Sequence, residues 1–157
     1  MTDGLQPIRV LFVCTGNSAR SQMAEAILGR LGGAGFEVRS AGTHPGVVNP
    51  LTIRALAEVG IDWSDARSKS VSEFVDEPFD YVITVCDQAR EACPVFPGGR
   101  VRLHWGFEDP AAAPGTDNEQ RAVFRRVRDE ISAQVAPFAD RVRQAGPHES
   151  APARPEA

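Results

Sequence analysis

Four short segments rich in β-branched and apolar residues constrain the fold of this chain more than any other feature. They are residues 8–13, 36–40, 80–85 and 100–103. Each is too short for a helix of useful length, so each is predicted to be a strand. Helical segments separate the strands, and this alternation is typical of a parallel sheet. The sequence therefore predicts an α/β fold, a single domain with a four-stranded parallel sheet flanked by helices.

Helices are predicted where apolar residues recur at spacings of three and four. The predicted helices are residues 21–31, 50–59, 71–75 and 118–142. Gly32 and Gly33 end the first helix; the second follows Asn49, a favourable N-cap, and stops at Gly60. Pro137 lies inside the last predicted helix, where a proline favours a bend.

Length and composition predict one domain and exclude several classes of protein. Residues 1–146 are predicted to form the domain, and residues 147–157, rich in proline, alanine and charge, a disordered tail. The net charge of -4 argues against nucleic acid or an acidic membrane surface as the partner. No apolar run approaches the length of a membrane span, and residues 1–7 lack the features of a signal peptide. A cytoplasmic location is therefore expected.

Two of the predicted strands lead directly into a cysteine, Cys14 and Cys86. Ligands bind beyond the carboxyl ends of the strands in an open parallel sheet, so both thiols are expected near one crevice. Together with Cys93 they form no framework typical of a small secreted protein. They are either buried thiols in a reducing compartment or reactive groups, and the residues after Cys14 favour reactivity.

The segment from Cys14 to Ser21 has the composition of an anion-binding loop between a strand and a helix. Small and polar residues let backbone N–H groups turn inward around an oxyanion. The residues expected to bind it are Thr15, Gly16, Asn17, Ser18, Ala19 and Arg20. The helix N-terminus adds positive charge, and the guanidinium of Arg20 can hold two oxygens at once. These groups should depress the pKa of Cys14, and Ser21 can donate a hydrogen bond to the thiolate.

The alternative for this segment is a structural cysteine in a turn before a helix. That alternative explains neither the glycine of the loop nor Arg20. An arginine six residues after a cysteine is weak evidence by itself, and the position between a strand and a helix gives it meaning.

Residues 14–21 resemble the signature loop of the low-molecular-weight protein tyrosine phosphatases and their arsenate-reductase relatives. The resemblance continues through residues 22–25, 40–42, 82–86, 93–94 and 104–110, and spans residues 9–143. It implies four parallel strands flanked by helices, as the strand and helix pattern also predicts. It further implies that Asp109, in a loop expected at residues 104–115, is the general acid that protonates the departing oxygen.

The loop alone does not separate a phosphatase from a reductase, because phosphate and arsenate have the same shape and charge. In the phosphatases the Asp-Pro pair is followed by aromatic residues that stack against a tyrosine substrate, whereas here three alanines, residues 111–113, follow. Cysteines at positions 14, 86 and 93 resemble the pattern of the thioredoxin-coupled arsenate reductases. In a regular helix the Cα atoms of Cys86 and Cys93 would be about 10 Å apart. A disulfide needs about 4.4–6.8 Å, so their pairing requires the segment to deform, as in a redox switch.

The resemblance implies a thiol relay that needs no flavin, nicotinamide or metal as cofactor. Cys14 attacks arsenic(V), and Asp109 assists the departure of an oxygen as water. Cys86 then attacks Cys14 and releases arsenite, and Cys93 attacks Cys86 to form a second disulfide that thioredoxin reduces. The implied partners are an arsenate or phosphate oxyanion and thioredoxin, with glutaredoxin or a low-molecular-weight thiol left open as the donor.

Other functions compete with this interpretation. The first alternative is a phosphatase acting on phosphotyrosine or small aryl phosphates. The second is a non-enzymatic oxyanion-binding regulator, which would need no general acid. A zinc site made by Cys86, Cys93 and His104 has spacings that match no familiar site.

A cation position is also implied by the resemblance. Some relatives bind potassium near the loop with positions that match Asn17, Glu25 and Ser40, together with an acidic residue. The acidic position matches Lys69, the single lysine of the chain. Its ammonium group would either take the place of the cation beside Glu25 or be a solvated surface group.

Overall fold

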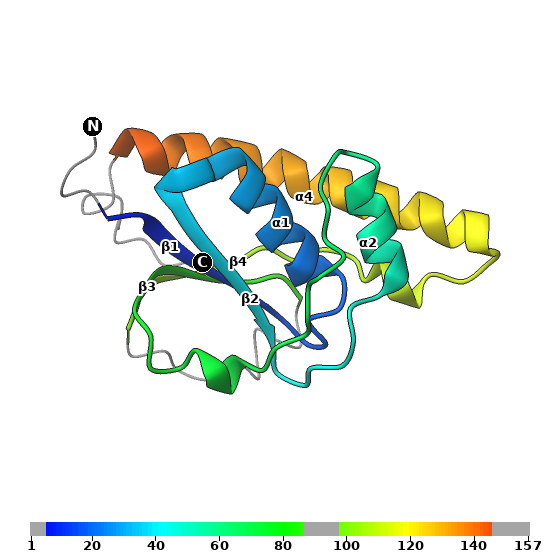
Figure 1. The fold of residues 1–157 in the computed structure, drawn as a ribbon, viewed down its shortest axis with the longest axis horizontal. Coiled ribbons are helices and arrows are strands. Elements are labelled where there is room, and N and C mark those ends of the chain that lie inside the picture. The colour runs from blue at the N-terminus through cyan, green and yellow to red at the C-terminus, as the bar shows by residue number, and fades with distance from the viewer. Residues whose placement is uncertain (1–5, 87–97, 146–157) are drawn as a thin grey trace.

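A four-stranded parallel sheet lies at the centre of the computed structural model, which describes residues 6–86 and 98–145. The strand order is β2-β1-β3-β4 (Figure 1). The strands are β1 (Ile8–Cys14), β2 (Phe36–Gly42), β3 (Phe79–Thr84) and β4 (Gly99–His104). The predicted α/β fold with four parallel strands is confirmed. Cys93 and the predicted tail at residues 147–157 lie outside the described residues.

Helices α1 (Arg20–Gly32) and α4 (Asp117–Ala145) lie side by side over the sheet, and α2 (Pro50–Ala57) packs against α4 (Figure 1). Short 3₁₀ helices are formed by η1 (Gly33–Gly35), η2 (Val71–Glu73) and η3 (Pro110–Ala112). The apolar face of α4 reaches the sheet at Phe138, whose ring packs edge-on against Tyr81 of β3 at 5.0 Å. Strand β1 is buried along almost its whole length, as expected for a central strand of a parallel sheet.

Element boundaries differ from the sequence prediction by a few residues. Strand β2 continues to Gly42, which pairs with Cys14 of β1. Strand β3 ends at Thr84, although the N–H of Val85 still donates to the carbonyl of Val13 at 2.9 Å. The ends of β1 and β3 therefore stay in contact up to the residue before Cys86.

The predicted helix signals have clear structural counterparts. The side chain of Asn49 accepts a hydrogen bond from the N–H of Leu51 at 2.8 Å and so caps α2 as predicted. Helix α2 ends at Ala57, ahead of Gly60, whose φ of 85° is in the left-handed region. Helix α4 runs through Pro137 without a break. The loop predicted at residues 104–115 contains the short helix η3, and the helix predicted at residues 71–75 is the 3₁₀ helix η2.

The order of the strands determines where a ligand can bind. Strand β1 pairs with β2 on one side and with β3 on the other. The connections from β1 to β2 and from β2 to β3 therefore run to opposite sides of β1. Such a switch point opens a crevice at the carboxyl ends of the strands. Cys14 ends β1 at this edge, and Cys86 follows β3 at the same edge. No helix in residues 6–86 and 98–145 is long and apolar enough to span a membrane.

Candidate active site

The loop between β1 and α1 is held open by hydrogen bonds from outside. Backbone N–H groups of the segment after β2, residues 43–49, donate to the carbonyls of Cys14, Thr15, Gly16 and Ser18 at 2.8–3.1 Å. In a planar trans peptide the C=O and the following N–H point in opposite directions. The N–H groups that follow these carbonyls therefore turn toward the inside of the loop. Inward N–H groups at the start of a helix make a concavity that suits an anion, and anion binding by this loop stays a prediction.

Cys14 lies at the centre of this loop and is buried. The N–H of Asn17 donates to its sulfur at 3.2 Å, and Ser21 Oγ is 2.8 Å from the same atom. The side-chain amide of Asn17 donates to Ser21 Oγ at 2.8 Å. Because that oxygen already accepts a hydrogen bond, its own proton is available to the sulfur of Cys14. Two donors therefore converge on the sulfur and stabilise negative charge there.

Arg20 and Asp109 face each other at the entrance to the loop. Arg20 Nη1 donates to the carbonyl of Phe107 at 3.2 Å, and its Nη2 is 3.7 Å from Asp109 Oδ2. The other carboxylate oxygen of Asp109 accepts from the N–H of Ala111 at 3.0 Å, at the start of η3. The side chain of Asp109 is 42% exposed and that of Arg20 14% exposed. The carboxylate of Asp109 is therefore open to solvent while it lies beside the guanidinium of Arg20.

Cys86 lies against the loop that contains Cys14. Its sulfur is 3.3 Å from the hydroxyl oxygen of Thr15, and its side chain is buried. Cys14 and Cys86 are free thiols in the structure. The predicted meeting of two thiols at one edge of the sheet is therefore observed, whereas the position of Cys93 lies outside the described residues.

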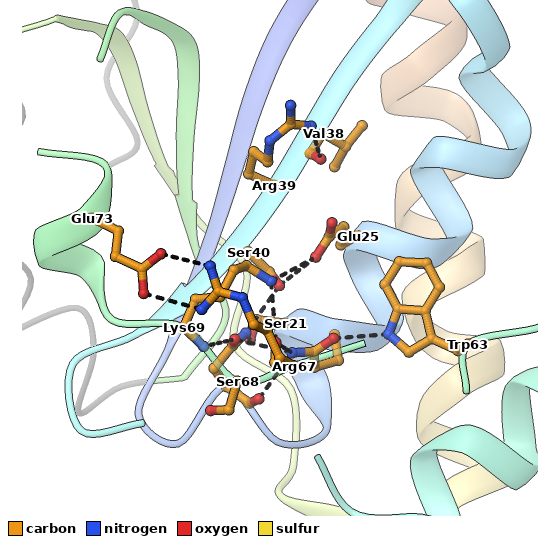
Figure 2. A network of polar contacts seen from close by, with 12 residues as sticks. Ser21, Glu25, Val38, Arg39, Ser40, Trp63, Arg67, Ser68, Lys69 and Glu73 are labelled. Carbon is orange, nitrogen blue, oxygen red and sulfur yellow. Dashed lines mark hydrogen bonds and ion pairs between the residues drawn. The ribbon is translucent and has the colours of Figure 1, made fainter. Parts of the chain in front are cut away.

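Lys69 forms part of a polar cluster beside the loop (Figure 2), and its backbone N–H donates to Asn17 Oδ1 at 2.8 Å. Its ammonium group is 3.6 Å from Glu25 Oε1, and Ser40 Oγ donates to the same carboxylate oxygen at 2.6 Å. Burial raises the pKa of Glu25, and Lys69 and Ser40 act in the opposite direction. The lysine side chain is only 13% exposed, so it is not a solvated surface group. In the described part of the chain, no three His, Cys, Asp or Glu side chains gather as metal ligands.

Two residues that support the loop have no role in the sequence prediction. Gln22 is fully buried and donates to the carbonyl of Asn17, and Trp63 donates to Gln22. Gln22 is a polar residue directly before the apolar positions of α1. This exception to the apolar spacing is the only sign in the sequence that its side chain has a special role. The partner segment around Trp63 is far away along the chain, so no local pattern indicates it.

A cavity of about 260 Å³ lies elsewhere, between α1, α4 and the segment after α2. The residues that line it are Ile27, Arg30, Leu31, Val59, Ile61, Arg128 and Ser132. None of them belongs to the loop or carries a thiol, so this cavity is not the site of thiol chemistry.

Comparison with known proteins agrees with this geometry. A family model described as "Low molecular weight phosphotyrosine protein phosphatase" matches residues 9–148. An arsenate reductase from Halalkalibacterium halodurans is 46% identical over 131 residues, which cover 83% of this chain and 94% of that protein. The solved structure of an arsenate reductase in the phosphate-binding state is 34% identical, with a TM-score of 0.73. It covers 85% of this chain and 97% of its own.

A further solved structure is the thioredoxin-dependent arsenate reductase of Corynebacterium glutamicum. It is 31% identical, has a TM-score of 0.68, and covers 89% of this chain and 64% of that chain.

Proposed function

Because the chain belongs to the low-molecular-weight phosphotyrosine protein phosphatase family, we propose that its oxyanion loop and paired thiols are the active site of an arsenate reductase. The protein is an enzyme that reduces arsenate to arsenite. The observation that carries the site assignment is the contact between Thr15 and Cys86, which brings a second thiol to the loop around Cys14. A hydrolase with this loop would need only one thiol.

In the first step, the sulfur of Cys14 attacks arsenic(V), and one oxygen leaves as water with a proton from Asp109. The donors around the loop hold the remaining oxygens, and Arg20 binds two of them through its planar guanidinium. The hydrogen bonds from Asn17 and Ser21 stabilise the attacking sulfur as an anion. This step forms an S–As bond and breaks an As–O bond, and the arsenic remains arsenic(V).

In the second step, the sulfur of Cys86 attacks the sulfur of Cys14. The S–S bond forms as the S–As bond breaks, and the electron pair of that bond leaves with arsenic, which becomes arsenic(III). Two thiols have then supplied the two electrons. Cys93 next attacks Cys86, which frees Cys14 and leaves a Cys86–Cys93 disulfide.

The electron donor in this proposal is thioredoxin, whose dithiol reduces the Cys86–Cys93 disulfide. The C. glutamicum relative is described as thioredoxin-dependent, which supports this choice. The relay needs free thiols between turnovers, so the proposal includes a reducing compartment, the cytoplasm. No cofactor is required, because every electron comes from a thiol.

Phosphotyrosine hydrolysis is the weaker candidate. Phosphate fits the same loop, and Asp109 would serve the same role. The chain places alanines in η3, after Asp109 and Pro110, where aromatic side chains would be needed to hold a tyrosine ring. Slow hydrolysis of small aryl phosphates is expected as a side activity.

Serine variants of the second and third cysteines test the relay. Without Cys86 no thiol can attack the arsenic-bearing Cys14, so arsenite should not leave. Without Cys93, one arsenite per enzyme should form before the enzyme stalls as a Cys14–Cys86 disulfide. The measurement is arsenite released per enzyme with thioredoxin, thioredoxin reductase and NADPH, and aryl phosphate hydrolysis is the control for an intact loop. If both variants reduce arsenate like the wild type, the relay is wrong.

A further inference from the structure

Gln22 lies between the oxyanion loop and the segment that contains Trp63. It follows the two residues that act directly in the site, Arg20 and Ser21, and its side chain is fully buried. We infer that Gln22, oriented by Trp63, is a positioning residue that fixes Asn17 and thereby the hydrogen bonds to Cys14. This inference deepens the proposed function, because the loop it concerns is the proposed arsenate site.

The amide nitrogen of Gln22 contacts three acceptors. They are the carbonyl of Asn17 at 3.1 Å, Asn17 Oδ1 at 3.0 Å and the carbonyl of Arg67 at 3.0 Å. Its amide oxygen accepts a hydrogen bond from the indole N–H of Trp63 at 2.8 Å. Figure 2 shows this indole pointing into the polar network from the side of the network opposite Glu73. One side chain therefore connects the loop to two points on the segment of residues 63–67.

Asn17 needs this support because its backbone is in a costly conformation. Its φ of 50° is in the left-handed region, where residues other than glycine are uncommon. That conformation directs its N–H toward the sulfur of Cys14. Its carbonyl lies in a buried position, and a buried carbonyl without a donor destabilises the arrangement that contains it. Gln22 supplies the donor, so the left-handed turn is retained.

Two groups that can only donate set the direction of the hydrogen bonds that lead from Trp63 to Cys14. The indole N–H of Trp63 can only donate, so the oxygen of the Gln22 amide faces it and the nitrogen faces Asn17. The backbone N–H of Lys69 donates to Asn17 Oδ1 at 2.8 Å, so the Asn17 nitrogen faces Ser21. The hydroxyl of Ser21 accepts from it and donates to Cys14. Trp63 and Lys69 thus set, through amide orientation, which proton reaches the catalytic sulfur.

Substitutions that remove the hydrogen bonds and keep a side chain of related shape test the inference. Gln22→Met removes the amide, and Trp63→Phe removes the indole N–H while keeping an aromatic ring. We expect kcat/KM for arsenate, phosphate affinity and the alkylation rate of Cys14 to fall about 10- to 100-fold in Gln22→Met and less in Trp63→Phe. Alkylation is measured with Cys86 and Cys93 replaced by serine, so that Cys14 is the only thiol. Phosphate affinity and alkylation need no arsenate turnover, so their outcome is separate from that of the proposed function.

Ser64→Ala is the matched control in the same segment. It removes an exposed hydrogen bond, from Ser64 Oγ to Asp62 at 2.7 Å, next to Trp63 but outside the network. All three readouts should stay within about twofold of the wild type, since exposed surface changes have small effects.

Gln22→Glu gives a readout that a purely structural role would not change. At neutral pH its carboxylate would face three acceptor oxygens with no proton to donate, whereas the protonated acid can donate one hydrogen bond to Asn17. The ratio of variant to wild-type phosphate affinity should therefore rise severalfold between pH 8 and pH 5.5, while the Gln22→Met ratio stays flat. The charged groups of this cluster include Glu25, Lys69, Arg39, Arg67 and Glu73, and both variants keep them. If Gln22→Met lowers only the melting temperature, or if the Gln22→Glu ratio does not change with pH, the positioning role is refuted.

Discussion

The glycine that ends β2 gives a sharp test of how tightly the oxyanion loop is packed. A Cβ atom on Gly42 would lie 2.5 Å from the carbonyl oxygen of Thr15 and 2.9 Å from the nitrogen of Asn17. Cβ atoms essentially never come closer than 3.0 Å to another heavy atom, so the loop must retreat in Gly42→Ala. The Thr15 carbonyl also accepts from the N–H of His44 at 2.8 Å, so it cannot retreat without straining that bond.

The expected effect on stability follows from overpacking. Such changes cost about 1–3 kcal/mol, which for a domain of this size lowers the melting temperature by about 2–12 °C. The effect on activity is larger, because a displacement of the loop misaligns the N–H of Asn17 with the sulfur of Cys14. A misplacement of about 1 Å is enough for a 100-fold loss, so kcat/KM should fall about 10- to 100-fold.

The assay compares Gly42→Ala with Gly46→Ala, the same chemical change in the adjoining segment. The N–H of Gly46 also bonds the loop, at the carbonyl of Gly16, but a Cβ on Gly46 meets no atom within 4 Å. Arsenate-dependent NADPH oxidation with thioredoxin gives kcat/KM, and phosphate inhibition reports the loop alone. Wild-type phosphate affinity and activity in Gly42→Ala would show that the loop is not packed as described and would refute the reasoning.

Three further predictions concern the charges of the site. Cys14→Ser should abolish arsenate reduction and aryl phosphate hydrolysis, and Arg20→Lys should reduce both severely, because a point charge does not replace the planar guanidinium; steady-state rates check both. Burial raises the pKa of Glu25 above its ordinary value of 4.5, so the folded state holds this proton more tightly than the unfolded state does. This contribution to stability is complete below pH 4.5 and is lost as pH rises through the folded pKa; the melting temperature of the wild type relative to Glu25→Gln should therefore fall across that window. Potassium should stabilise the protein no more than sodium at equal ionic strength if Lys69 occupies the cation position; a potassium-specific rise of several degrees in melting temperature would contradict this.

The fold could be predicted because its signals are local and repeated. Each strand is a short apolar run, and some boundaries carry a local signal, such as the N-cap Asn49 at the start of α2. The bounds of helices and strands differ by a few residues, and at the end of β2 the pairing with β1 decides. Gly42 has no β-forming side chain, and it belongs to β2 because Cys14 pairs with it.

The candidate site could be predicted in part for the same reason. Residues 14–21 are continuous in sequence, so a single segment indicates the loop, its arginine and the donor to the sulfur. The supports of the loop come from distant segments, and Trp63 and Gln22 are 41 residues apart. A sequence pattern does not reveal such a pair, because the hydrogen bond exists only after α1 has packed against the segment that follows α2.

The position of Cys86, just after the end of β3, would separate reduction from hydrolysis in this fold. In the roles proposed for them, the loop, Arg20 and Asp109 would serve any tetrahedral oxyanion, so they would not determine what happens after the first attack. The hydrogen bond from Val85 to Val13 keeps the chain after β3 beside β1, and the next residue is Cys86. Its sulfur therefore lies against the hydroxyl of Thr15, a residue of the loop. In the proposed relay, a water molecule that attacked the Cys14 intermediate would give hydrolysis, whereas the thiol of Cys86, already beside Thr15, would attack sulfur and release arsenite.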